Sequence, residues 1–224
     1  DKRYAGRKDD FQQTQLNKLN EIGRIIKKEK ENVDELIVLI NGDLFNTPRI
    51  GQLFLIKIIT AIKKWNTKVY IVPGNHDLYN DNISTLYKTH LGLLSIFQMV
   101  EILSKSSPVV FEIGPYKLGL QGKEYGIGIE NKEDTYMYTS EEEVDFKMIS
   151  VHGMLMDKEP PFDTFSLTKD IRKKTNANIV TTGHYHPGFK DIIEENFAMF
   201  NPKSMIRTKR IKANLKRIPG GNNK

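Results

Sequence analysis

Cysteine is absent from this 224-residue chain. A disulfide framework and a thiolate metal site are therefore both excluded. Any bound metal must take its ligands from His, Asp, Glu or Asn, and such ligands suit Mn, Fe, Zn or Mg. We expect a cytoplasmic protein, because the lack of cysteine fits a reducing compartment.

Long apolar runs are missing as well. No stretch approaches the roughly 20 apolar residues that a membrane-spanning helix needs, so we expect no membrane partner. With 38% hydrophobic and 28% charged residues, the composition is typical of a soluble globular protein. The length suits one ordinary domain, and no linker or internal repeat divides it, so the prediction is a single domain over residues 1–224.

Acidic residues are missing from the last part of the sequence. Residues 203–224 contain eight Lys or Arg and no acid, whereas the preceding 202 residues contain 26 basic and 28 acidic groups. Within this basic segment, Ile211, Leu215 and Ile218 recur at helical spacing. Two interpretations stay open: the segment contacts the phosphate backbone of a nucleic acid, or it is a helix docked by its apolar stripe with its charges in water.

Hydrophobic periodicity predicts an α/β protein. Period-3.6 patterns predict four helices, around residues 11–26, 53–62, 83–97 and 165–175. Short apolar runs predict seven strands, at residues 36–40, 68–72, 109–113, 116–122, 147–151, 178–182 and 197–200. The third and fourth of these strands are expected to form a hairpin that turns at Gly114 and Pro115, and residues 124–145 are expected to form a long loop.

Polar side chains follow four of these strands at once. The clusters are NGD (41–43), GNHD (74–77), HG (152–153) and GHYH (183–186). Four of the five histidines lie in them, and only His90, which we expect to be a surface or capping residue, lies elsewhere. Loops that follow strands at one edge of an α/β sheet converge on a single crevice, so these side chains are expected to meet. His184 and His186 would point the same way in extended backbone.

Such a cluster matches the needs of phosphoryl chemistry on two cations about 4 Å apart. The Asp43 carboxylate can bridge two metals, neutral imidazoles supply nitrogen ligands, and an Asn carbonyl adds an oxygen without charge. The competing interpretation is that these strand ends are solvated turns. Turn chemistry accounts for Gly, Asn and Asp, but it does not account for four histidines.

The blocks "GDLFN", "GNHD", "VHG" and "GHYH" stand in this order between residues 42 and 186. In this they resemble the calcineurin-like metallophosphoesterase superfamily. The resemblance implies a four-layer αββα fold, in which two packed mixed β-sheets are flanked by helices. It also implies two divalent metal ions, with Mn as the expected metal and Fe, Zn or Mg as alternatives.

The resemblance further implies a role for each matching residue. Asp43 would bridge both metals, and one metal site would be completed by Asn75, His152 and His184. His186 would belong to the other site. His76 would donate a proton to the leaving oxygen or stabilise charge on the phosphoryl group, and Asp77 would orient the His76 ring.

A looser resemblance narrows the expected substrate. The stretches "RKDDF", "VPGNHDLY", "VHGML" and "GHYHPGF" are similar to small, often phage-encoded exonuclease-like phosphoesterases. This implies a DNA nuclease, with a role in DNA repair, a homodimer and a partner ATPase as expectations by analogy. Two other functions stay open. One is a small-molecule phosphodiesterase or a protein or nucleotide phosphatase, and the other is a non-catalytic metal-binding scaffold.

Two departures from the family pattern stand out. The first family block, Asp-x-His, is missing before the predicted first helix, and we expect that the printed sequence is truncated at both ends. As printed, it would hold one complete metal site and one that lacks two ligands. The second departure is "NPKS" (201–204), where relatives usually read Asn-Pro-Gly-Ser. Lys203 there predicts either a different turn, since Gly tolerates positive φ, or a basic contact to substrate.

Overall fold

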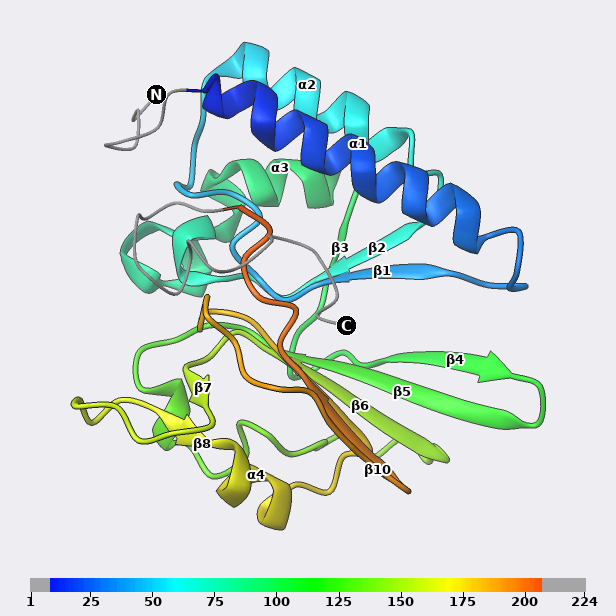
Figure 1. The fold of residues 1–224 in the computed structure, drawn as a ribbon, viewed down its shortest axis with the longest axis vertical. Coiled ribbons are helices and arrows are strands. Elements are labelled where there is room, and N and C mark those ends of the chain that lie inside the picture. Colours follow the sequence, from blue (N-terminus) through cyan, green and yellow to red (C-terminus); the bar gives the residue numbers. More distant parts are fainter. Residues whose placement is uncertain (1–8, 207–224) are drawn as a thin grey trace.

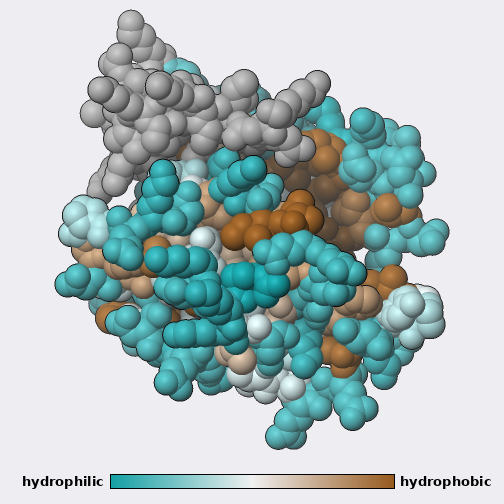
Figure 2. All heavy atoms as spheres, turned by 60° about the horizontal axis from the view of Figure 1, so that its bottom comes forward, coloured by the Kyte–Doolittle hydropathy of each residue, from teal (hydrophilic) through white to brown (hydrophobic). Residues whose placement is uncertain are grey.

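The computed structural model describes residues 9–206. The predicted basic helix with Ile211, Leu215 and Ile218 lies outside the described residues, as does most of the basic segment. Among residues 9–206, no helix is both long and apolar enough to cross a membrane. The face shown in Figure 2 is mainly hydrophilic, with apolar side chains in a few separate groups.

The N-terminal half forms a small parallel sheet with helices on one side (Figure 1). Its strands are β1 (Ile37–Ile40), β2 (Lys68–Ile71) and β3 (Glu101–Ile102), in the order β1-β2-β3. The helices are α1 (Phe11–Glu29), α2 (Gln52–Lys63) and α3 (His90–Ile96). Helix α1 begins where the sequence predicts, because the Asp10 side chain caps it by accepting a hydrogen bond from the Gln13 amide.

The C-terminal half forms a six-stranded mixed sheet in the order β10-β11-β9-β6-β5-β4. Its strands are β4 (Val109–Ile113), β5 (Tyr116–Lys123), β6 (Phe146–Val151), β9 (Ile179–Thr182), β10 (Ile192–Glu194) and β11 (Phe197–Phe200). The four central strands are parallel, and β4 and β10 run antiparallel at the edges. Helix α4 (Thr168–Lys174) and the short pair β7 (Leu155–Met156) and β8 (Ser166–Leu167) lie on the outer side (Figure 1).

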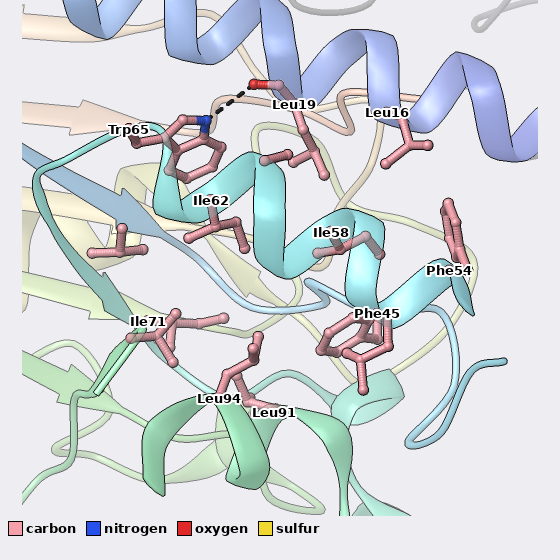
Figure 3. Packing of buried hydrophobic residues seen from close by; sticks show 14 of the residues in the cluster. Leu16, Leu19, Phe45, Phe54, Ile58, Ile62, Trp65, Ile71, Leu91 and Leu94 are labelled. Carbon is pink, nitrogen blue, oxygen red and sulfur yellow. Dashed lines mark hydrogen bonds between the residues drawn. The ribbon is translucent and has the colours of Figure 1, made fainter. Parts of the chain in front are cut away.

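Buried side chains fill three layers between these elements. One cluster packs α1, α2 and α3 against the small sheet, and in it the indole of Trp65 donates to the Leu19 carbonyl at 3.1 Å (Figure 3). A second cluster lies between the two sheets, where Tyr70 and Val72 of the β2 segment meet Phe111 and Leu120. The third lies under α4 and the 129–138 segment.

Alternation along β2 shows how one strand serves two layers. Ile71 belongs to the helix-side cluster, whereas its neighbours Tyr70 and Val72 belong to the cluster between the sheets. Successive side chains of a strand point to opposite faces, so a strand of apolar residues can be buried on both faces. The predicted αββα arrangement of two packed sheets with helices outside is confirmed, but only the six-stranded sheet is mixed, because all pairs in the small sheet are parallel.

Several predicted elements change in detail. The helix expected at 83–97 is a 3-10 segment over Ile83–Lys88 followed by α3, and the strands β3, β7, β8 and β10 were not predicted. His90 is a capping residue for a loop, because the Ile50 amide donates to its Nδ1 at 3.0 Å. Burial lowers the pKa of His90, and the charge of Arg49 adds to this effect.

Candidate metal centre

The four polar clusters meet where the strands of both sheets end. From the first sheet, β1 leads into Asp43 and β2 into Asn75; from the second, β6 leads into His152 and β9 into His184. Nε2 of His152 lies 3.4 Å from an Asp43 oxygen and 3.2 Å from the Asn75 side-chain oxygen. Nδ1 of His184 lies 3.1 Å from that same Asn75 oxygen and 3.2 Å from His152 Nε2. The predicted convergence of these side chains is therefore confirmed.

The donor atoms fit a divalent cation. Within residues 9–206, one group of acidic and histidine side chains could hold a metal: Asp43, His152 and His184, whose ligand atoms all lie within 4.8 Å of one another. The Asn75 oxygen adds a fourth donor. Two imidazole nitrogens and two oxygens suit Mn, Fe or Zn. Lone pairs that face one another at about 3 Å repel unless a cation or a proton lies between them. A bound metal ion would supply that cation.

Asn41 sets the tautomer of His152. Nδ1 of His152 lies 2.7 Å from the Asn41 carbonyl, which accepts hydrogen bonds only, so Nδ1 carries the proton. Nε2 then presents its lone pair to the centre, as a metal ligand requires. The Asn41 side-chain oxygen accepts from the hydroxyls of Ser150 at 2.7 Å and Thr181 at 3.0 Å. Asn41 thus ties the end of β1 to β6 and β9 beneath the centre.

The electrostatics also favour a bound cation. Burial raises the pKa of Asp43, but the interactions with His152 and His76 together outweigh burial, and the net pKa is lowered. Burial and the charge of His152 lower the pKa of His184 to about 4. For His152, burial lowers the pKa, but its contacts with Asp43 raise it above the ordinary value. At neutral pH the centre therefore presents a charged carboxylate and, at His184, a neutral imidazole.

Glycines in the motifs allow this close approach. A Cβ at Gly42 would overlap the ring of His152, and one at Gly74 would overlap the carboxylate of Asp43. A Cβ at Gly183 would overlap the Asn41 carbonyl oxygen. Each of these three glycines is needed for space, because a site residue or its orienting carbonyl occupies the position of the missing side chain.

A family comparison agrees with this fold. The family model described as calcineurin-like phosphoesterase matches residues 11–188. The chain belongs to this family. Its members are phosphoesterases that use divalent metal ions, so this protein is a metal-dependent hydrolase acting on phosphoester bonds. In a search of curated proteins, none matches the chain.

Solved structures resemble this phosphoesterase at low sequence identity. The crystal structure of TT1561 from Thermus thermophilus is 12% identical with a TM-score of 0.50, and the match covers 84% of each chain. The structure of Haemophilus influenzae NAD nucleotidase is 14% identical with a TM-score of 0.44. That match covers 75% of the phosphoesterase chain and 36% of the nucleotidase.

Asp77 of the phosphoesterase does not orient the His76 ring, and that prediction is wrong. The Asp77 carboxylate is fully buried and accepts from three backbone amides, those of Asp43 at 2.9 Å, Gly74 at 3.0 Å and Phe45 at 3.0 Å. The carboxylate therefore links the loop after β1 to the loop after β2. Burial raises the pKa of Asp77 to about 6, and the charge of Asp43 adds to the rise while the backbone amides oppose it.

The Asn46 carbonyl takes the orienting role instead. It lies 3.2 Å from Nδ1 of His76, which leaves the Nε2 edge of this exposed ring free to face a substrate. The His76 backbone amide donates to an Asp43 oxygen at 3.0 Å and so fixes that carboxylate. His76 therefore supports the centre through its backbone and leaves its side chain available for proton transfer.

His186 is not part of the group formed by Asp43, His152 and His184. The expected parallel orientation of His184 and His186 is wrong, because His184 adopts a left-handed conformation with φ 69° and the segment is not extended. His186 is still near, since its charge contributes to the lowered pKa of His184. Its assignment to a second metal stays a prediction from the resemblance.

Tyr125 borders the centre, although no motif in the sequence marks it. Its ring lies 5.6 Å from the ring of His184 and 5.8 Å from that of His152, measured between centroids. Its amide donates to the Pro73 carbonyl at 3.2 Å, so the segment after β5 is anchored to the segment after β2. A Tyr within a polar loop carries no signal of this contact. The one clue is its place directly after a predicted strand.

The turn at Lys203 keeps the conformation expected for glycine. Lys203 has φ 65°, so the prediction of a different turn is wrong, and a lysine occupies a left-handed position. The other alternative from the sequence, a basic contact to substrate, stays a prediction.

Proposed function

We propose that this phosphoesterase hydrolyses phosphodiester bonds of DNA and uses Mn as its metal. The observation that carries the proposal is the meeting of Asp43, Asn75, His152 and His184 beside an exposed His76. This arrangement puts cation ligands and a proton donor at one place, which is what cleavage of an anionic ester requires.

Each residue has a defined task in this proposal. Asp43, Asn75, His152 and His184 would hold one divalent ion, and bound divalent ions neutralise charge at the phosphoryl group and make water a stronger nucleophile. Nε2 of His76 would give a proton to the leaving oxygen while its Nδ1 donates to the Asn46 carbonyl. Asp77 would keep the two loops in register through the three backbone amides.

The distribution of charge favours a polyanionic substrate on one side of the centre. Residues 11–68, which include α1 and α2, contain ten Lys or Arg and six Asp or Glu. Residues 124–145 contain one Lys and eight Asp or Glu. A nucleic acid is therefore expected to approach over the helical half and to avoid the 124–145 loop. The basic segment at residues 203–224 adds to this attraction.

The test is degradation of end-labelled linear DNA with Mn, with EDTA as the metal-free control. The wild-type chain is expected to cut DNA, and His76→Ala is expected to lower the rate by about 10²- to 10⁴-fold, the usual range for loss of a general acid. His90→Gln is the matched control, because His90 is the one histidine outside the four polar clusters and its Nδ1 accepts from the Ile50 amide, and its rate should equal that of wild type.

The same assay separates the alternatives. If DNA survives while a small aryl phosphodiester is cut, the substrate is a compact phosphoester and the nuclease proposal is rejected. If neither substrate is cut with Mn, the scaffold interpretation is favoured. If His76→Ala cuts DNA as fast as wild type, the proposed proton donor is wrong.

A further inference from the structure

The loop that carries Lys203 packs directly on the loop that carries the metal-centre histidines. Asn201 donates from its side-chain amide to the Tyr185 carbonyl at 3.1 Å, and the Ser204 amide donates to the His186 carbonyl at 3.4 Å. In Figure 1 this orange segment leaves the six-stranded sheet after β11 and crosses toward the helical half. Lys203 is therefore fixed beside the segment that bears His184 and His186.

The side chain of Lys203 lies along Gly188, at the end of the same histidine loop. A Cβ at Gly188 would overlap Cγ of Lys203 and lie 3.1 Å from its Cε, so the aliphatic stem covers the glycine backbone. The backbone of Lys203 is held in turn, because its amide donates to the Asn201 side-chain oxygen at 2.8 Å. The stem is thus directed by packing, and the ammonium lies at its far end, about 6 Å from Cα across five single bonds.

The backbone at Lys203 is in a conformation that lysine disfavours. Its φ of 65° is left-handed, where a side chain crowds the following carbonyl and glycine would not. Most other non-glycine residues with positive φ have a reason for it. Asp43 and His184 belong to the metal centre, Asn and Asp tolerate this region, and Gln98 lies just beyond the end of α3, where such a conformation is common. Lys203 has none of these reasons, and strain of this kind concentrates at functional sites.

The charge of Lys203 has no counter-ion within residues 9–206. No ion pair or side-chain hydrogen bond of its ammonium is found there. Within residues 9–206, Lys203 is thus a strained, packed lysine beside the histidine loop whose charge remains available for an anionic substrate.

We propose that Lys203 is a substrate-binding residue, whose ammonium binds a phosphate next to the one that is cleaved. The inference rests on the proposed nuclease function. A phosphate next to the cleaved one is favoured because of where the Lys203 side chain lies. Its Cγ and Cε pack against Gly188, which is two residues beyond His186. A substrate with several phosphates would use this contact, and a small aryl phosphodiester with a single phosphate would not.

The test compares three substitutions at this position. Lys203→Gly removes the charge and the strain, Lys203→Met removes the charge and keeps an aliphatic stem, and Lys203→Arg keeps the charge. Both uncharged variants are expected to raise KM for a DNA oligonucleotide about tenfold, and to reduce the slope of log affinity against log salt by about one. Neither should change kcat/KM for the aryl phosphodiester. Lys203→Arg should behave like wild type, and so should Lys190→Ala, a control at an exposed lysine on the adjoining segment.

Thermal unfolding separates the effect of strain at Lys203 from the effect of its charge. Lys203→Gly is expected to raise Tm by about 2 °C while it weakens DNA binding, because strain is released at the cost of some chain entropy. Lys203→Met should weaken DNA binding without this rise. If wild type cuts DNA and the two uncharged variants have unchanged KM and salt slope, this inference is overturned and the nuclease function stands. If wild type neither binds nor cuts DNA, both are overturned.

Discussion

Asp77→Ala is expected to lower the free energy of unfolding of this phosphoesterase by about 3 kcal/mol. The carboxylate accepts from the backbone amides of Asp43, Phe45 and Gly74 in a fully buried position, and Ala would leave all three without a partner. A buried unsatisfied donor costs about 1–3 kcal/mol, and the relief of burying a carboxylate offsets part of that sum. Urea unfolding followed by circular dichroism measures the change.

Two further variants check the cause of this loss. Asp77→Asn keeps one acceptor oxygen and should fall between wild type and Asp77→Ala. Asp191→Ala removes an exposed carboxylate and should stay within about 0.5 kcal/mol of wild type. If Asp77→Ala were as stable as Asp191→Ala, the carboxylate would not be what joins the loops that carry Asp43 and Asn75.

Gly183→Ala is expected to weaken metal binding by about 10- to 100-fold and to lower stability by about 2 kcal/mol. The new Cβ would overlap the Asn41 carbonyl oxygen and lie 3.0 Å from Nδ1 of His152. It would break the contact that sets the His152 ring and its tautomer, and loss of such an outer contact typically costs this much affinity. The overlap itself strains a packed region, which accounts for the loss of stability.

Calorimetric titration with Mn and thermal unfolding measure both effects. The matched control is Gly51→Ala, because Gly51 has an ordinary φ of −62° and no atom within 4 Å of the added Cβ. This control should bind Mn as wild type does. Equal Mn affinity in Gly183→Ala and Gly51→Ala would contradict the role given to the Asn41 carbonyl.

The convergence of the site could be predicted because it depends on features that a sequence carries. Apolar runs that end in polar clusters mark strands whose ends meet at one edge, and His152 and His184 come from such clusters. The αββα layers followed from the resemblance, and the buried alternation of β2 agrees with them.

Other features could not be predicted because their partners are backbone atoms or distant segments. The three donors to Asp77 are backbone amides, which have no sequence signature, so the motif suggests the neighbouring His76 as its partner instead. His184 lies in a tight turn in which the Tyr185 amide donates to the Gly183 carbonyl at 2.9 Å, and its left-handed conformation is one for which glycine is the usual residue. Strands such as β3 and β7 have two residues each, too few to show a period.

The central claim is that Asp43, Asn75, His152 and His184 form one metal site, and equilibrium dialysis against Mn tests it most directly. Wild type and the control variant His90→Gln are expected to bind Mn with the same affinity. His184→Ala and Asn75→Ala should each weaken binding at least about tenfold, because each removes a donor atom from the group. If wild type binds no divalent metal, or if His184→Ala binds Mn as tightly as His90→Gln does, the site described is not the metal centre of this phosphoesterase.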